Sequence, residues 1–232
     1  MNNSQLQAIK QAVPVIKQAF LFIKQQLTVG ISEKDLEQAL TAYLKKAGFS
    51  QLAFKHIIAF GFNAYFPHHK PANKKLAINE MVLIDFGIKV NGWCTDITRT
   101  FYHGQPDKRF KKIYTTVLKA QQAAINKLKT NRYSKTIDQA ARNIINQAGY
   151  KKAFRHNTGH GLGRKIHQPP YLSSKIKRGV ILTDGELVTI EPGIYLKDWG
   201  GVRIEDMVTV ARSPQILSKI IPKKYSDILV RN

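Results

Sequence analysis

Two carboxylates placed inside apolar runs constrain this chain more than any other feature. Asp85 interrupts the apolar stretch 82–86, and Glu191 interrupts the stretch 187–194 in the same way. Burying an unpaired carboxylate is unfavourable by several kcal/mol, so a folded chain must supply each of them with a compensating partner. The fold is therefore expected to bring cations or cationic side chains to both runs.

The first of these runs is followed by a second strand-like segment that carries another carboxylate. Asn91-Gly92 predicts a tight two-residue turn, and a hairpin built on it sets Asp85 opposite Thr98. Side chains alternate along a strand, so Asp96 shares a face with Asp85 as a diagonal neighbour, roughly 7–8 Å away at Cα. The alternative is that Asp96 pairs with Arg99, but alternation places Arg99 on the opposite face. The pattern favours two carboxylates that share a metal ion.

A second hairpin repeats this arrangement. A register centred on Asp198 sets Glu191 directly opposite Glu205. Facing like charges destabilise a sheet unless a cation lies between them. The alternative is a surface ladder neutralised by Lys or Arg, and the apolar run around Glu191 weighs against it.

His160 lies between the two hairpins in the segment 158–163, where three glycines leave room around one imidazole. His167 follows seven residues later, and His68 precedes the first carboxylate strand. A single histidine is more often structural than catalytic, so their meaning comes from the set. Four carboxylates and one imidazole suit two adjacent divalent ions, such as manganese, cobalt, iron or zinc, better than one structural zinc.

Composition narrows the class of protein. The single cysteine, Cys94, excludes an internal disulfide framework. No apolar run reaches the roughly 18 residues that span a bilayer, and no signal sequence is evident, so we expect a cytoplasmic chain with no membrane partner. The net charge is +22, from 37 Lys and Arg against 15 Asp and Glu. It indicates either a solvated basic surface or a polyanion-binding face, and both remain open.

Helical and β-type periodicities alternate along the chain. We expect an α+β fold in which a helix pair followed by strands occurs twice, giving two similar halves around one core in a single catalytic domain, 1–232. Pro14 is expected to kink or restart the first helix. The helices are expected at 5–26, 32–48, 109–128 and 136–148, and the strands at 52–60, 81–88, 93–102, around His160, at 186–196 and at 202–211.

The candidate ligands stand in five blocks that resemble those of the pita-bread metallopeptidases, which include methionine aminopeptidase, prolidase and aminopeptidase P. The resemblance covers most of the chain and implies the pita-bread fold, a curved antiparallel sheet covered by helices in two pseudo-symmetric halves. The blocks are residues 84–87, 96–101, 158–163, 189–195 and 201–206.

Within that family, the segments 96–100, 191–195 and 201–206 resemble the Xaa-Pro peptidases. This likeness implies substrate contacts for His68 and His167, a role for Tyr195 in lining the site, and a role for Arg203 in ordering it through a carboxylate. Two features depart from the pattern: we expect a catalytic domain without the N-terminal domain usual in the branch, and Gln168 stands where an acidic residue is usual. The implied metal ligands are Asp85, Asp96, His160, Glu191 and Glu205.

We therefore expect a dinuclear exopeptidase that hydrolyses Xaa-Pro bonds near a peptide N-terminus through a metal-bridged water, with Glu191 accepting its proton. Manganese or cobalt is the first choice of metal, followed by zinc or iron. Methionine aminopeptidase is the alternative that the chain length favours. A non-catalytic pita-bread module that binds RNA, ribosomes or protein is the alternative that the +22 charge favours. A peptide substrate, a homodimer and weak polyanion binding are the partners compatible with these expectations.

Overall fold

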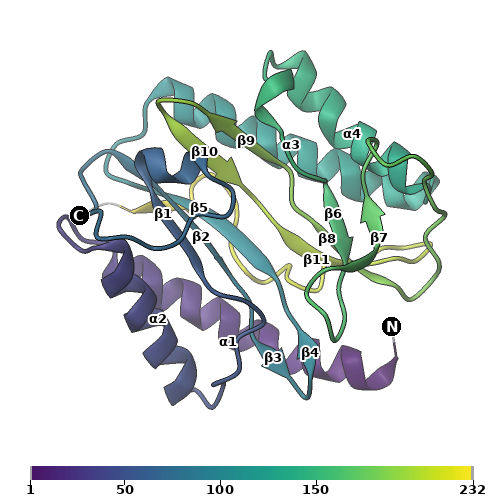
Figure 1. Ribbon diagram of the computed structural model, residues 1–232, viewed down its shortest axis with the longest axis horizontal. Helices are drawn as coiled ribbons and strands as arrows, with labels where there is room; N and C mark the ends of the chain where they lie inside the picture. Colours follow the sequence, from purple (N-terminus) through teal and green to yellow (C-terminus); the bar gives the residue numbers. More distant parts are fainter. Residues whose placement is uncertain (1, 231–232) are drawn as a thin grey trace.

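Two helix pairs lie outside two four-stranded sheets in the computed structural model, which describes residues 2–230 (Figure 1). The pair α1 (Asn3–Gln26) and α2 (Glu33–Lys46) belongs to the first half of the chain, and α3 (Lys108–Thr130) and α4 (Ser134–Gln147) belong to the second. The predicted order, helix pair and then strands in each half, is confirmed.

The first sheet has the order β1-β2-β5-β12 and the second the order β11-β8-β6-β7. Neighbouring strands are antiparallel except β12, which runs parallel to β5. The first sheet contains β1 (Ile57–Phe60), β2 (Glu80–Phe86), β5 (Ile97–His103) and β12 (Leu229–Val230). The second contains β6 (Gly159–Gly161), β7 (Gln168–Leu172), β8 (Leu187–Ile190) and β11 (Asp206–Thr209). Two-stranded ribbons are formed by β3 (Lys89–Val90) with β4 (Trp93–Cys94) and by β9 (Gly193–Leu196) with β10 (Gly200–Arg203), and short 3-10 turns by η1 (Gly61–Tyr65) and η2 (Lys151–Ala153).

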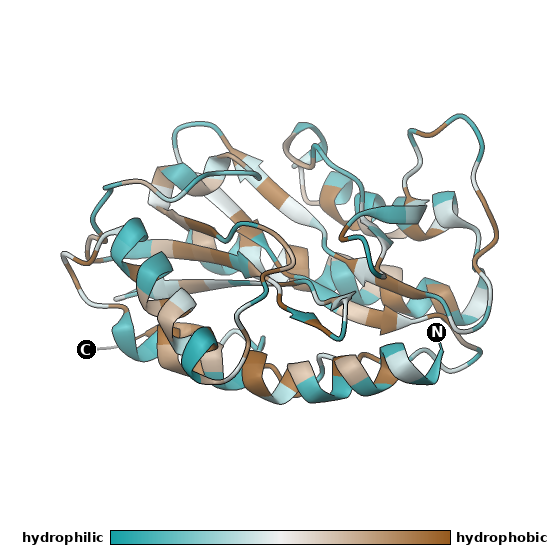
Figure 2. Cartoon of the chain, turned by 60° about the horizontal axis from the view of Figure 1, so that its bottom comes forward, coloured by the Kyte–Doolittle hydropathy of each residue, from teal (hydrophilic) through white to brown (hydrophobic). Residues whose placement is uncertain are grey.

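Pro14 lies inside one continuous helix, so the predicted restart of α1 is wrong. Pro14 is exposed, and the opposite stripe of α1, which includes Ile9, Ile16 and Phe20, is buried in the core. Packing of that stripe outweighs the one backbone hydrogen bond that proline removes. Figure 2 shows α1 along one side of the molecule, with hydrophobic and hydrophilic residues interleaved along it.

The predicted strands are too long at the places where candidate ligands stand. The segment 93–102 divides around Asp96, 186–196 divides at Glu191, and 202–211 divides at Glu205. The amide of Glu191 donates to the carbonyl of Thr158, and that of Glu205 donates to the carbonyl of Thr98. The backbone amides of both residues are therefore hydrogen-bonded outside their own hairpin, and the hairpin ladder is interrupted there. The strand predicted at 52–60 begins only at residue 57, and β7 and β12 were not predicted.

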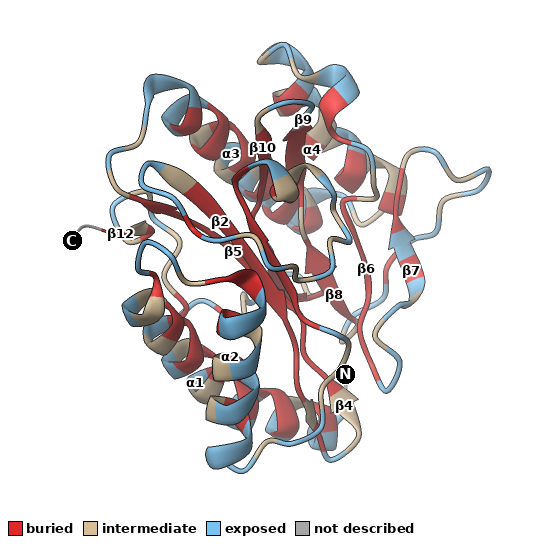
Figure 3. Ribbon diagram, turned by 60° about the vertical axis from the view of Figure 1, so that its left-hand side comes forward, coloured by how far each residue is buried: buried red, intermediate tan, exposed pale blue. Residues whose placement is uncertain are grey.

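The two halves share one apolar core. Figure 3 shows β2, β5 and β8 buried over most of their length between the helix pairs. The carboxylates described below therefore lie in, or directly beside, strands that are buried in this core. Within residues 2–230, no helix is both long and apolar enough to cross a membrane.

Candidate metal centre

The hairpin registers agree with the sequence prediction. Asp85 on β2 lies opposite Thr98 on β5. In the second hairpin Gly193 pairs with Arg203, and Ile190 pairs with Asp206, so both flanking ladders keep the register centred on Asp198. This register places Glu191 and Glu205 across from each other, at the break between the ladders.

A cavity of about 670 Å³ opens where the two halves meet. The first half contributes Asp85 and Asp96, and the second contributes the remaining predicted ligands. All five predicted ligands and both predicted substrate-contacting histidines line this one cavity. They are His68, Asp85, Asp96, His160, His167, Glu191 and Glu205.

The side chains approach closely around His160. Its Nε2 atom lies 3.5 Å from Oδ2 of Asp96 and 3.4 Å from Oε1 of Glu191. Ligand atoms of Asp96, His160 and Glu205 all lie within 4.8 Å of one another. Two buried oxygens, Oδ1 of Asp85 and Oε1 of Glu205, have no hydrogen-bond partner among the residues that the structure describes. These oxygens have free lone pairs of the kind that a bound cation would occupy.

The electrostatics also fit divalent metal. Burial, reinforced by the neighbouring carboxylates, raises the pKa of both Asp96 and Glu205 well above the ordinary value. Burial raises the pKa of Glu191 to about 8 and lowers that of His160 to about 4. Crowded carboxylates beside a neutral imidazole form an oxygen-rich donor set suited to manganese, cobalt, iron or zinc. A cation at this place would relieve the repulsion that raises the carboxyl pKa values.

Arg203 and Tyr195 lie behind the carboxylates, each only 2% exposed. Nη2 of Arg203 donates to Oδ2 of Asp85 at 2.6 Å, its Nη1 to the Tyr195 hydroxyl at 2.8 Å, and its Nε to the Thr98 hydroxyl at 3.0 Å. The Thr98 hydroxyl in turn donates to Oε2 of Glu205 at 2.7 Å. One guanidinium thus orients carboxylates from both hairpins.

Sequence reasoning missed His156, which also lines the cavity. Its Nδ1 lies 2.8 Å from the carbonyl oxygen of Asn157, and its Nε2 lies 2.7 Å from the Tyr195 hydroxyl. A carbonyl only accepts, so Nδ1 carries the proton and Nε2 accepts from Tyr195. Burial, followed by the charge of Arg203, lowers the pKa of His156 to about 3. The available signal was its position four residues before His160, on the same side of an extended chain.

The alternative pairing of Asp96 with Arg99 does not occur. Arg99 is fully buried on the opposite side of β5, where its Nη2 donates to Oδ1 of Asp206 at 2.9 Å. Its Nη1 donates to the backbone carbonyls of Thr98 and Glu205. Arg99 thereby ties β5 to the second hairpin from behind, and Asp96 keeps its carboxylate for the cavity.

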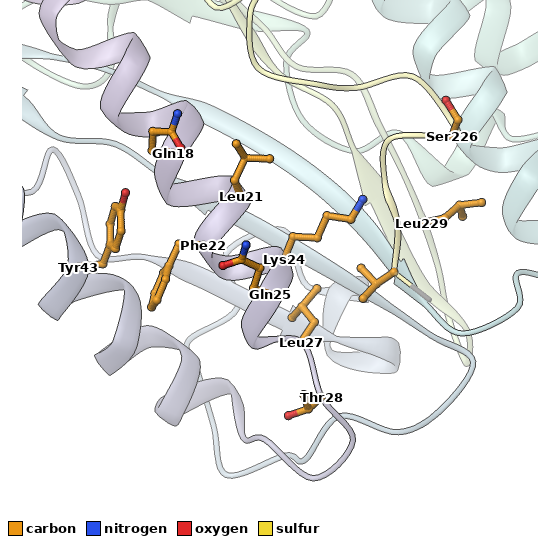
Figure 4. A pocket seen from close by; sticks show the side chains of 11 residues that line it. Gln18, Leu21, Phe22, Lys24, Gln25, Leu27, Thr28, Tyr43, Ser226 and Leu229 are labelled. Carbon is orange, nitrogen blue, oxygen red and sulfur yellow. The ribbon is translucent and has the colours of Figure 1, made fainter. Parts of the chain in front are cut away.

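A second hollow, of about 1020 Å³, lies on the outer side of α1 (Figure 4). Among residues 2–230, its lining contains no histidine and no carboxylate, and the titratable side chains there are Lys24 and Tyr43. It therefore offers no donor set for a metal ion. The lining residues are Gln18, Leu21, Phe22, Lys24, Gln25, Leu27, Thr28, Tyr43, Ser226, Leu229 and Val230.

The family model for metallopeptidase family M24 matches residues 7–212. The chain belongs to this family. It is 37% identical over 225 residues to a putative Xaa-Pro aminopeptidase of Mycoplasma genitalium, a match that covers 96% of this chain and 63% of that protein. It is 34% identical over 212 residues to an Xaa-Pro dipeptidase of Pyrococcus horikoshii, covering 91% of this chain and 60% of that protein.

Solved structures agree with this membership. The X-Pro aminopeptidase of Thermotoga maritima superposes with a TM-score of 0.92 at 32% identity, over 100% of this chain and 64% of that one. The Xaa-Pro dipeptidase of Bacillus anthracis gives a TM-score of 0.92 at 34% identity, over 100% of this chain and 63% of that one. The predicted pita-bread fold is confirmed. The M24 chain described here spans somewhat under two thirds of the length of these relatives.

Proposed function

We propose that this M24 chain is a dinuclear metallo-exopeptidase that hydrolyses Xaa-Pro bonds at the N-terminal end of peptides. The observation that carries the proposal is the convergence of four carboxylates and one imidazole in a single cavity between the halves. The peptidases to which the chain is similar are described as Xaa-Pro aminopeptidase or Xaa-Pro dipeptidase, which supports this substrate class over methionine release.

Asp85, Asp96, His160, Glu191 and Glu205 would hold the two ions, with manganese or cobalt as the first expectation and zinc or iron as the next. Bound divalent ions supply an activated water and polarise the carbonyl of the scissile bond. These five residues offer one imidazole and four carboxylates, and two of the carboxylate oxygens are buried with no hydrogen bond from any residue in 2–230. This donor chemistry supports a pair of oxygen-preferring ions.

Glu191 is proposed to accept the proton of the attacking water. Its carboxylate lies at the cavity wall, with its side chain 17% exposed, whereas that of Asp96 is 6% exposed. A proton acceptor must reach the water from the substrate side, and Glu191 is the more accessible of these two carboxylates. His68 and His167 are exposed and line the same cavity, so they are placed to donate hydrogen bonds to the substrate carbonyl or the leaving nitrogen.

Arg203 and Tyr195 are proposed to act through Asp85. The Arg203 guanidinium is buried, and three of its hydrogen bonds fix the side chains of Asp85, Tyr195 and Thr98. Both residues therefore position groups that meet the substrate, with Arg203 contributing at the cavity wall.

Peptide hydrolysis after metal loading tests the proposal. Wild type, Glu191→Ala and the control Glu186→Ala, which changes a glutamate outside the cavity, are loaded with Mn²⁺ or Co²⁺. They are then given an Ala-Pro dipeptide, a longer Ala-Pro peptide and a Met-Ala peptide. Wild type and control are expected to cleave the Xaa-Pro bonds, and Glu191→Ala to lose at least ~10²-fold in rate, the typical share of a general base.

The panel separates the competing functions. Release of methionine without Xaa-Pro cleavage would support the methionine aminopeptidase alternative. A metal-loaded chain that cleaves none of the three peptides would contradict the proposed function.

A further inference from the structure

The positive charge of this chain is concentrated in one part of it. Residues 108–183 contain 18 of the 37 Lys and Arg but only one of the 15 Asp and Glu. That single acid, Asp138, is fully buried and holds Arg142 and the Thr158 hydroxyl. No carboxylate from this segment therefore reaches the surface, whereas the rest of the chain has 19 basic and 14 acidic residues. Uniform lysine enrichment would not give this asymmetry.

Helices α3 and α4 form the first part of this segment and pack side by side (Figure 1). We call their exposed surface the basic face. Surface helices usually alternate acids with bases, because oppositely charged pairs three or four residues apart stabilise them. The basic face shows only cations, amides and hydroxyls. Its exposed members are Lys108, Arg109, Lys111, Lys112, Lys119, Gln122, Asn126, Lys129 and Thr130 on α3, and Gln139, Asn143, Asn146 and Gln147 on α4.

Aromatic rings support the basic side chains at the beginning of α3. The Arg109 guanidinium lies 5.1 Å from the Trp199 ring, and the Lys112 ammonium lies 5.8 Å from the Tyr150 ring. Tyr150 precedes Lys151 and Lys152, both exposed, so the contact brings these two lysines beside the start of α3. Cation–π contacts restrict the lysine and arginine rotamers and lower the entropy lost when an anion binds.

The two acids that flank the segment 108–183 in the sequence, Asp107 and Asp184, are already engaged. Asp107 caps α3 by accepting from the amide of Phe110. Asp184 pairs with Arg132 at 2.5 Å. The lysines on the outer stripe of α3, namely Lys108, Lys112, Lys119 and Lys129, have no ion pair among the residues that the structure describes.

We propose that the basic face binds the phosphate backbone of double-stranded RNA. A row of cations without exposed carboxylates is the arrangement that phosphate recognition requires. The major groove of A-form RNA is deep and narrow, and two adjacent helices are about 20 Å wide, so the face meets the backbone and carries no base readout. Exposed amides such as those of Gln122, Asn126 and Asn143 both donate and accept, which suits the 2′-hydroxyls of RNA.

A lipid surface fits the same face less well. Interfacial helices insert large apolar side chains, and no large hydrophobic residue of α3 or α4 is exposed. The cavity of the metal centre is lined by no residue of either helix. RNA binding is therefore separable from peptide hydrolysis, and the two proposals can fail independently.

The test compares two variants of equal net charge. One replaces Lys108, Lys112, Lys119 and Lys129 of the basic face by Gln, and the control replaces the exposed Lys10, Lys34, Lys45 and Lys46 of α1 and α2 by Gln. Gln and Lys have similar helix propensities, so both variants are expected to fold. Affinity for a short RNA duplex is measured by fluorescence anisotropy between about 50 and 200 mM salt.

Wild type and control are expected to bind with the same steep salt dependence. The basic-face variant is expected to lose about 0.9 in log–log salt slope for each phosphate contact removed, and on the order of 10- to 100-fold in affinity at the middle of the range. All three proteins should hydrolyse peptide at one rate.

Several results would overturn the proposal. The first is that wild type does not bind RNA, and the second is that both variants lose the same RNA affinity. The third is that wild type binds a DNA duplex as tightly as the RNA duplex. The fourth is that binding to anionic phosphatidylglycerol vesicles requires the lysines of the basic face whereas RNA binding does not.

Discussion

Glu205 shows at the scale of one residue why this site calls for a cation. Its Oε1 is buried and has no hydrogen bond to any residue that the structure describes, while its Oε2 accepts from Thr98. Burial together with Glu191 and Asp85 raises its pKa well above the ordinary value. Such a group destabilises the metal-free chain and contributes to stability only when a cation is bound.

Replacing Glu205 by Gln should therefore separate stability from metal binding. The metal-free variant is expected to unfold at a higher temperature than metal-free wild type, because one buried like charge is gone. With Mn²⁺ at 100 times its dissociation constant, wild type should gain about 2.7 kcal/mol and the variant clearly less. Thermal unfolding with chelator and with Mn²⁺ measures both. An equal gain in the two proteins would exclude Glu205 from the metal-binding set.

His56 is a second residue whose burial has a measurable consequence. It is 2% exposed, neither ring nitrogen has a hydrogen bond within the described part of the chain, and burial lowers its pKa to about 4. The unfolded chain binds a proton near the ordinary value of 6.5, so the folded chain loses stability as pH falls from about 6.5 to 4.

His56→Leu is expected to remove this loss. Relative to wild type, the variant should become more stable by about 2 kcal/mol on going from pH 7.5 to pH 5. Denaturant unfolding at the two pH values provides the measurement. A stability difference independent of pH would show that His56 keeps an ordinary pKa in the folded chain.

At the scale of elements, one carboxylate at the start of α2 fixes the segment that carries His68. Glu33 is fully buried. Its two oxygens accept from the amide of Phe60 at 2.7 Å, from Asn63 at 2.9 Å, from His69 at 2.8 Å and from the amide of Ala72 at 2.8 Å. Burial alone raises the pKa of Glu33, but the hydrogen bond from His69 and the three others bring it below its ordinary value.

Glu33→Gln replaces one accepting oxygen by a donor and leaves two of these four groups without an acceptor. We expect a loss of about 1–3 kcal/mol in unfolding free energy. We also expect a lower rate of peptide hydrolysis, because the segment that carries His68 is held by fewer hydrogen bonds. Glu37→Gln, one turn further along α2, is the control for stability and should change it little. Unchanged stability in Glu33→Gln would mean that the segment is held elsewhere.

The elements also show what local sequence can predict. The turn at 91–92 and the alternation of side chains give the register of β2 with β5, because a hairpin is set by neighbouring residues. The breaks at Glu191 and Glu205 could not be predicted in this way. They arise because the two amides bond to the carbonyls of Thr158, just before β6, and Thr98, on β5, which come from other parts of the chain.

Long-range contacts explain why the roles of Glu33 and His156 were not predicted from the sequence. Glu33 reads as an ordinary first-turn helix residue, and its four donors lie 27–39 residues further along the chain. His156 gains its role only through Tyr195, 39 residues away. Periodicity identifies which residues face inward, and tertiary structure decides which partner each of them meets.

At the scale of the whole molecule, the metal centre depends on both halves. Asp85 and Asp96 come from the first half, and His160, Glu191 and Glu205 from the second, so neither half holds the full set of donors. Arg203 and Arg99 tie the halves together on either side of β5. The distribution of charge is also a property of the whole molecule, because the basic face lies in the second half alone.

The central claim is that these five side chains form a site for two divalent ions. It is tested most directly by counting the Mn²⁺ ions that stay bound to each chain after loading and gel filtration, in wild type, Glu191→Ala and the control Glu186→Ala. Two ions per chain are expected in wild type and in the control, and fewer in Glu191→Ala. Wild type that retains no metal, or Glu191→Ala that retains as much as wild type, would contradict it.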